Sequence, residues 1–112
     1  MYIVIFITVG EREEAYRIAR VLVDEGYAAC VNIVDRVRSI FRWEGNHDEV
    51  EESLLIVKSL DTKLAELIER VKELHSYRVP EIIAIEVMGG SKDYLEWVSA
   101  QAKVGERETK NG

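Results

Sequence analysis

The residues best suited to chemistry gather in one short stretch of the chain. It runs His-Ser-Tyr-Arg-Val-Pro-Glu from His75 to Glu81 and holds the only proline and one of the two histidines. Pro80 lacks a backbone donor and fixes its own φ, so it must end the preceding helix and precede the next strand. His75 and Tyr77 are therefore held at a rigid junction that could form a site. In the alternative interpretation, Pro80 only stops the helix and His75 is a C-terminal residue favoured by the helix dipole.

Charged and aromatic residues inside strand-like sequence are further candidates. Arg42, Glu52 and Lys58 each need a water-facing side or an ionic partner. Trp43 ends a strand-like run, where it is either a hydrophobic anchor for a hairpin or a stacking surface for a ligand. Lys58 ends an apolar run and Glu81 follows the proline, so we expect these two side chains at neighbouring strand ends, facing a shared cleft.

Four strands and three helices are expected to position these residues. Apolar runs and helical spacing predict strands over residues 2–9, 27–43, 50–59 and 81–88, and helices after residue 10, from residue 61 and after residue 91. This order is that of a ferredoxin-like α+β sandwich, βαββαβ, with both main helices on one face of an antiparallel sheet and a short C-terminal helix. The long second strand carries Asp35, Arg36 and Arg38, which predict a bulge or bend where the strand changes neighbours.

Length and composition limit the classes of function. The chain has 112 residues, so we expect one domain over residues 1–105 and a polar tail over residues 106–112. A net charge of −6 argues against nucleic acid or an anionic membrane as partner and favours cationic ligands. The single cysteine, Cys30, lies in an apolar context typical of a buried thiol and fits a reducing cytoplasm. Charged residues soon interrupt the first apolar run, so neither export nor membrane insertion is indicated.

Several motifs, in this order, resemble those of the CutA family of divalent-cation tolerance proteins. They are Cys-Val-Asn-Ile from Cys30, Ser-Ile-Phe-Arg-Trp-Glu-Gly from Ser39, the spaced Glu52, Leu55 and Lys58, the His75 stretch, and Tyr-Leu-Glu-Trp from Tyr94 to Trp97. The likeness runs from about Ile3 to Trp97. The chain departs from the family at Phe41, Ser59 and Ser76, where Tyr, Thr and often Pro are usual.

The resemblance implies a homotrimer in which the long hairpin strands extend pairing across subunits. Such exchange would explain why the second strand outruns its partners. It also implies a ligand-binding cleft between subunits, formed by Arg42, Trp43, Glu52, Lys58, Tyr77, Glu81 and Trp97.

Copper is the cofactor that the resemblance suggests. Some family members bind it through a Cys late in the first strand and paired His residues before the Tyr motif. Ile7 and Leu74 stand at two of those positions here, leaving His75 alone. The resemblance therefore implies weak copper binding at His75, completed by carboxylates of a neighbouring subunit, and no tightly bound cofactor.

The function that follows is a cytoplasmic, trimeric, metal- or small-ligand-responsive regulatory module. The alternatives are a signalling trimer that binds a small metabolite, similar in architecture to the PII proteins, and a scaffold that anchors another protein. The best enzymatic alternative, a small acyl-phosphate hydrolase, needs an anion-binding loop after the first strand. Glu11, Glu13 and Glu14 in that loop would repel a phosphate, so we expect no enzyme.

A copper site at His75 makes affinity depend on pH, because a metal-binding imidazole must be unprotonated. We expect calorimetric titration of the assembled protein to show weak copper binding that falls as the solution is acidified. His75→Ala should abolish most of this binding, whereas His47→Ala, on a predicted solvated turn, should leave it unchanged. Equal copper affinity in His75→Ala and the parent chain would exclude the site.

Overall fold

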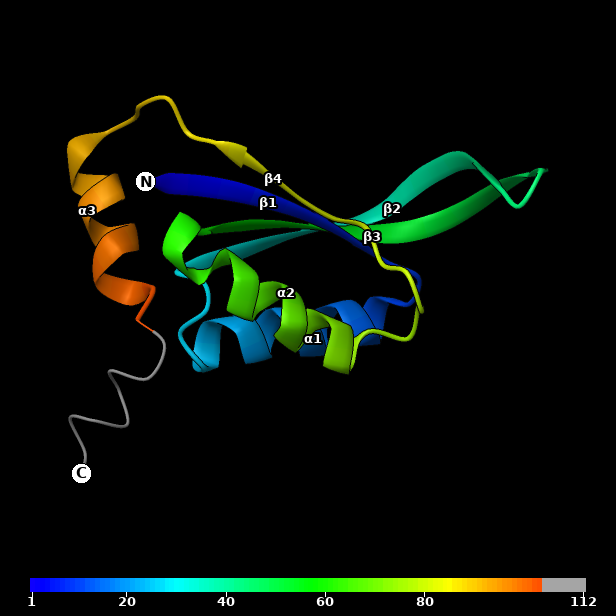
Figure 1. Cartoon of the computed structure of the whole chain (residues 1–112), viewed down its shortest axis with the longest axis horizontal. Coiled ribbons are helices and arrows are strands. Elements are labelled where there is room, and N and C mark those ends of the chain that lie inside the picture. The colour runs from blue at the N-terminus through cyan, green and yellow to red at the C-terminus, as the bar shows by residue number, and fades with distance from the viewer. Residues whose placement is uncertain (104–112) are drawn as a thin grey trace.

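Strands and helices follow one another along the chain in the order that the hydropathy pattern predicts. The computed structural model describes residues 1–103. The elements are β1 (Tyr2–Val9), α1 (Arg12–Asp24), β2 (Cys30–Trp43), β3 (Asn46–Leu60), the 3-10 turn η1 (Asp61–Lys63), α2 (Leu64–Leu74), β4 (Ile82–Glu86) and α3 (Lys92–Gln101). The strands form one antiparallel sheet in the order β2-β3-β1-β4. The predicted ferredoxin-like α+β fold is confirmed, with α1 and α2 on one face of the sheet (Figure 1).

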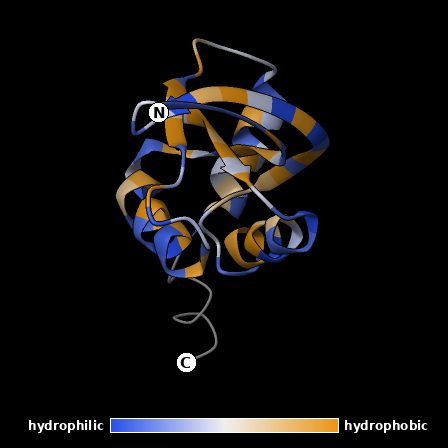
Figure 2. Ribbon diagram, turned by 90° about the vertical axis from the view of Figure 1, so that its right-hand side faces the viewer, coloured by the Kyte–Doolittle hydropathy of each residue, from blue (hydrophilic) through white to orange (hydrophobic). Residues whose placement is uncertain are grey.

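Alternation along the central strand β1 builds the core. Successive strand residues point to opposite faces, so every second side chain of β1 lies beneath the helices. Hydrophobic and hydrophilic positions alternate along the strands in Figure 2. The buried set is Ile3, Ile5, Ile7 and Val9 from β1, Leu55 and Val57 from β3, Ala15, Ile18, Ala19 and Leu22 from α1, Ala28 from the turn after α1, and Leu67 and Val71 from α2. The third helix, α3, lies at the end of the sheet where β1 begins (Figure 1), and its Ser99 hydroxyl is 2.7 Å from the Tyr2 hydroxyl.

A bulge interrupts β2 at the charged residues that the sequence analysis singled out. The register with β3 shifts between Val34 and Val37, and Arg36 has a φ of 62°. The Asp35 carboxylate accepts a hydrogen bond from the Ser53 hydroxyl at 3.1 Å, which ties the bulge to the facing strand. The predicted bulge is confirmed. The predicted change of neighbours is wrong for the single chain, because β2 pairs with β3 on both sides of the bulge.

Beyond the bulge, β2 and β3 continue as a two-stranded arm. The pairing of β1 with β3 reaches only as far as Ser53, so residues 37–52, here called the hairpin arm, project from the sheet (Figure 1). Glu44 and Gly45 form its turn, with φ of 50° and 82°. A two-stranded hairpin is marginally stable in water by itself, so contacts with another molecule would stabilise the arm.

Several boundaries differ from the predicted ones because turns set them. Gly26, with a φ of 82°, starts a turn that delays β2 to residue 30, and the tight turn at Gly45 lets β3 begin at residue 46. The last strand spans five residues, not the predicted 81–88. Asp61 opens η1, and its carboxylate accepts a hydrogen bond from the Met1 amino group at 3.1 Å. Cys30 is half-buried and not buried as expected.

The end of the chain lies outside the described residues. This applies to the last two residues of the predicted domain, 104 and 105, and to the predicted tail over residues 106–112. Within residues 1–103, no helix has the length and apolar character needed to cross a membrane.

The turn of the hairpin arm gives a test of the backbone geometry. An Ala at Gly45 would have free space but a left-handed φ of +82°, so Gly45→Ala should lower the free energy of unfolding by about 1 kcal/mol. Gly89→Ala is the matched control, since an added Cβ there also meets nothing within 4 Å and its φ is not left-handed. The control should be neutral or stabilised by up to about 1 kcal/mol. Chemical denaturation at one fixed protein concentration measures both, and equal effects would contradict the strained turn.

Candidate functional site

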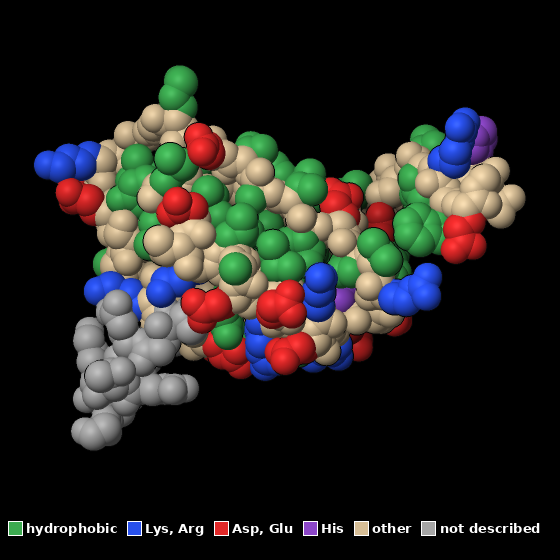
Figure 3. Space-filling model, in the orientation of Figure 1, with side chains coloured by type: hydrophobic (Ala, Val, Ile, Leu, Met, Phe, Trp, Pro, Cys, Tyr) green, Lys and Arg blue, Asp and Glu red, His purple; other side chains and the backbone are tan. Residues whose placement is uncertain are grey.

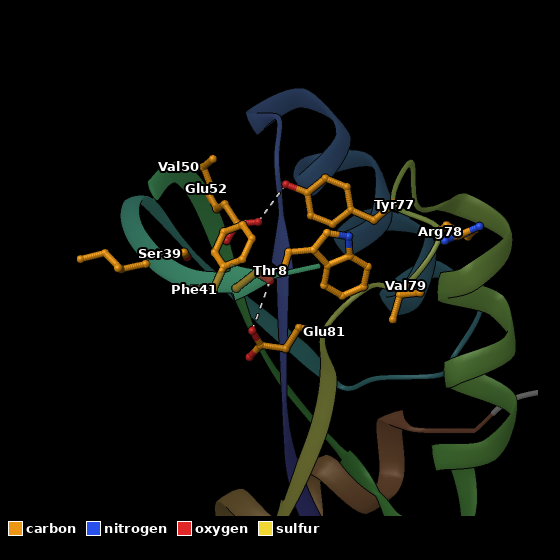
Figure 4. A pocket seen from close by; sticks show the side chains of 11 residues that line it. Thr8, Ser39, Phe41, Val50, Glu52, Tyr77, Arg78, Val79 and Glu81 are labelled. Atoms are coloured by element: carbon orange, nitrogen blue, oxygen red, sulfur yellow. Dashed lines mark hydrogen bonds between the residues drawn. The ribbon is translucent and has the colours of Figure 1, made fainter. Parts of the chain in front are cut away.

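A cleft lies where the hairpin arm meets the loop between α2 and β4. Its volume is about 700 Å³, within the range of small-molecule sites. The end of β1, the arm and the loop contribute side chains to it (Figure 4). The lining residues are Thr8, Ser39, Ile40, Phe41, Trp43, Val50, Glu52, Tyr77, Arg78, Val79 and Glu81. Four of the predicted cleft residues, Trp43, Glu52, Tyr77 and Glu81, are therefore brought together in one chain.

Strand periodicity gives the cleft its aromatic wall. Ser39, Phe41 and Trp43 alternate along β2 and so share one side of the arm, and Val50 of β3 stands opposite Ser39. Phe41 is 40% exposed and Trp43 is 48% exposed. Large aromatic side chains left open to solvent in this way are typical of surfaces that bind something.

A buried carboxylate forms the polar floor. Glu52 is 7% exposed, and its Oε2 accepts a hydrogen bond from the Tyr77 hydroxyl at 2.9 Å (Figure 4). Burial, then the hydrogen bond and negative charge of Glu52, raises the pKa of Tyr77 to about 12. The phenol therefore stays protonated at neutral pH and acts as a hydrogen-bond donor. At the other side of the cleft, the Thr8 hydroxyl donates to Glu81 at 3.4 Å.

His75 fixes the loop that carries Tyr77. Its imidazole is fully buried; Nδ1 accepts the Tyr77 backbone N–H at 3.0 Å, so Nε2 donates to the Thr8 carbonyl at 2.8 Å. The His75 and Tyr77 rings also pack together, with centroids 4.9 Å apart. Buried Glu14 of α1 accepts the Ser76 N–H at 2.8 Å and lies 3.6 Å from Nδ1. The loop is thereby anchored to both β1 and α1.

The same hydrogen bonds bear on the predicted copper site. Both ring nitrogens of His75 are engaged, so a metal ion would have to displace either the Thr8 carbonyl or the Tyr77 N–H. Within residues 1–103, no three or more His, Cys, Asp or Glu side chains converge as a metal site. Copper binding at His75 stays a prediction. In the structure, this side chain holds the loop that carries Tyr77 against β1.

Gly10 is a site residue that sequence reasoning missed. An added Cβ at this position would lie 2.6 Å from the Tyr77 Oη, so only glycine leaves room for the phenol to reach Glu52. The available signal was a glycine at the junction of β1 and α1. Thr8 and Glu14 were missed as well, because their partners are 67 and 62 residues away along the chain.

The remaining predicted cleft residues lie elsewhere in the single chain. The Arg42 guanidinium contacts the His47 ring on the arm, with Nε 3.3 Å from Nε2. Trp97 packs beside Tyr94 on α3, with ring centroids 5.6 Å apart. Neither residue lines the cleft.

The expectation that Lys58 and Glu81 face one cleft is wrong for the single chain. Lys58 pairs opposite Val4, near the start of β1, whereas Glu81 contacts Thr8 near its end. Four residues of strand separate these positions by roughly 13 Å. Antiparallel pairing of β1 with β3 fixes this separation, because it reverses the order of residues along the two strands.

Comparison with known proteins identifies the family of this fold and site. The family model described as CutA1 divalent ion tolerance protein matches residues 3–101, which include every predicted cleft residue. The chain belongs to the CutA1 family. Its match to the family spans all the strands and helices described above except the first residue of β1.

Individual CutA proteins agree with this assignment in sequence and structure. The divalent-cation tolerance protein CutA of Thermus thermophilus is 48% identical over 95 residues, which are 85% of this chain and 92% of that protein. Its solved structure superposes with a TM-score of 0.90, covering 92% of this chain and 100% of the other. The Archaeoglobus fulgidus structure, described as a periplasmic divalent cation tolerance protein, has a TM-score of 0.89 at 41% identity, with the same coverage.

A plant relative is longer than this chain. The chloroplastic protein CutA of Arabidopsis thaliana is 45% identical over 86% of this chain, but the match spans only 53% of that protein. The shared part is thus the domain described here. These relatives are named for divalent-cation tolerance or as CutA proteins, and not as enzymes.

The hydrogen bond at the cleft floor of this CutA1-family chain gives a test. Glu52→Gln removes the negative charge beside Tyr77, so the pKa of Tyr77 should fall from about 12 toward 10. Because the folded pKa lies above the unfolded one, the free energy of unfolding should decrease as pH rises from about 10 through 12, and less steeply in Glu52→Gln. Carbon-13 NMR of labelled tyrosine measures the pKa directly. Glu51→Gln, at an exposed neighbouring residue, is the control and should leave the titration of Tyr77 unchanged.

Proposed function

We propose that the chain is a homotrimeric, ligand-responsive regulatory module for divalent-cation tolerance, and that it binds its ligand without chemical turnover. One observation carries the proposal. The face of the sheet opposite α1 and α2 is apolar and uncovered in the single chain, and it runs up to the cleft. A surface of this kind is typical of a subunit interface.

The residues of this face follow from the same alternation that builds the core. Val4 and Phe6 of β1 and Ile56 of β3 are half-buried, while Ile83 and Ile85 of β4 are 55% and 54% exposed. The register places Ile83 beside Phe6 and Ile85 beside Val4. Hydrophobic side chains gather over β1 and β4 in Figure 3. Contact with another copy would remove this surface from water, which is the main favourable term in association.

The hairpin arm supports assembly in the same way. Its β2 edge has unpaired backbone groups, and its apolar Ile40 is 75% exposed. An arm that projects from one subunit suits contact with the next. Since the cleft lies at the base of the arm, an assembled neighbour would close it, and ligand binding would be linked to assembly.

A binding role fits the chemistry of the cleft. Tyr77 has a pKa of about 12 and donates a hydrogen bond to Glu52, so its phenol stays protonated and is a poor base or nucleophile at neutral pH. For location we propose the cytoplasm, on the basis of the single cysteine. The Archaeoglobus relative is described as periplasmic, so cell fractionation is the deciding measurement.

Native mass spectrometry tests the trimer. We expect the parent chain to be trimeric at micromolar concentration and Ile85→Glu to dissociate it, because the variant places a charge in the proposed interface. Ala65→Glu is the control, since it adds the same charge to an exposed position of α2 on the other side of the sheet and should leave the trimer intact. A parent chain that stays monomeric would overturn the assembly, and so would a trimer that Ile85→Glu leaves intact.

A further inference from the structure

We infer that the cleft takes an organic cation: a primary or quaternary ammonium group attached to an apolar, preferably aromatic, body. The inference rests on the proposed function, since it names the chemical class of ligand for the same cleft. The cleft combines an aromatic wall with two acidic side chains, Glu52 and Glu81, that form no ion pair within residues 1–103.

Two carboxylates, Glu52 and Glu81, give the cleft its acidic character. Within residues 1–103, the ion pairs include neither Glu52 nor Glu81, although both line the cleft. Among the described residues, Glu52 accepts a hydrogen bond from the neutral hydroxyl of Tyr77, and Glu81 accepts one from the neutral hydroxyl of Thr8. Glu52 is 7% exposed, and a carboxylate so far removed from water is costly without a cation. The cleft therefore has a negative charge that a ligand can neutralise.

The one basic residue in the lining does not supply that charge. Arg78 is exposed, and Figure 4 shows its side chain pointing away from Phe41, Glu52 and Glu81. The nearby salt bridge of Arg12 is made with Asp35, at 3.1 Å, and Arg42 contacts His47. Within residues 1–103 of a single chain, a cationic ligand would thus meet two carboxylates and no guanidinium that points at them.

The aromatic and aliphatic walls of the cleft favour a ligand that joins an ammonium group to an apolar body. Phe41, Trp43 and Tyr77 present aromatic faces, and aromatic faces attract ammonium groups by cation–π interaction. Val50 and Val79 add aliphatic surface. A volume of about 700 Å³ is far larger than a bare metal ion needs, and it suits a molecule with an apolar body. An inorganic cation would instead need several converging ligands, and no three His, Cys, Asp or Glu side chains of residues 1–103 converge in this way.

Three benzyl compounds of similar size test the charge requirement on the whole protein. Benzyltrimethylammonium is the cation, benzyl alcohol is the neutral probe and benzoate is the anion. Two-dimensional NMR of the tryptophan indole N–H groups reports the site, because Trp43 lines the cleft and Trp97 lies on α3. We expect the cation to shift the Trp43 signal saturably and to leave Trp97 in place. Benzoate should have no effect, and benzyl alcohol should bind at least about tenfold more weakly than the cation.

Two variants assign the interaction to its groups. Glu52→Gln keeps the shape and removes the charge, so it should weaken binding of the cation at least about tenfold without changing the response to benzyl alcohol. Glu51→Gln, one residue away and exposed, is the matched control and should bind as the parent does. Trp43→Leu changes a half-exposed side chain and should also weaken binding of the cation. Calorimetry measures this affinity, because the variant lacks the Trp43 NMR signal.

The outcomes separate this inference from the proposed trimer. A trimer whose Trp43 signal does not respond to the cation, or responds equally to benzyl alcohol, overturns the inference and leaves the assembly standing. That result would also follow if a side chain of a second copy filled the cleft. A monomer that binds the cation through Glu52 overturns the assembly and leaves the inference standing.

Discussion

Alternation of side chains along β1 constrains both faces of the sheet and, through them, the site. Ile3, Ile5 and Ile7 are buried beneath α1 and α2, so the residues between them must point to the other face. Those residues are also apolar, as expected for a strand covered on both sides. Within residues 1–103 of the single chain, α1 and α2 cover one face of the sheet (Figure 1). The proposed assembly rests on the other, uncovered apolar face, because contact with another copy would remove it from water.

The loop between α2 and β4 is positioned by the other side of the same strand. His75 donates to the carbonyl of Thr8, and the hydroxyl of Thr8 donates to Glu81, so β1 holds both ends of the loop. Glu14 of α1 adds a third attachment through the Ser76 N–H. These bonds are buried or half-buried, where a lost partner costs more than a surface contact. Tyr77 is consequently presented to the cleft in one orientation, and Gly10 leaves the room that this orientation needs.

The chemistry of the cleft suits recognition of a charged ligand and not turnover. A protonated phenol, a buried carboxylate and an aromatic wall provide donors, charge and apolar surface. The histidine next to them uses both ring nitrogens to hold the backbone, so a metal ion or a proton-transfer partner would have to displace one of these hydrogen bonds. Chains of the same family are named for divalent-cation tolerance, and the proposed ligand is a cation of a different chemical kind.

The sequence by itself determined the order of elements, the bulge at Asp35 and Arg36, and the family. These features depend on hydropathy period, turn residues and local motifs, which are all readable over short stretches of chain. Tertiary structure alone decided which candidate residues meet. Trp43, Glu52, Tyr77 and Glu81 share a cleft, whereas Lys58 lies four strand residues away from it and Trp97 lies on α3. The role of His75 was likewise decided by a carbonyl 67 residues away. Strand register and long-range hydrogen bonds set these positions, and neither leaves a local pattern in the sequence.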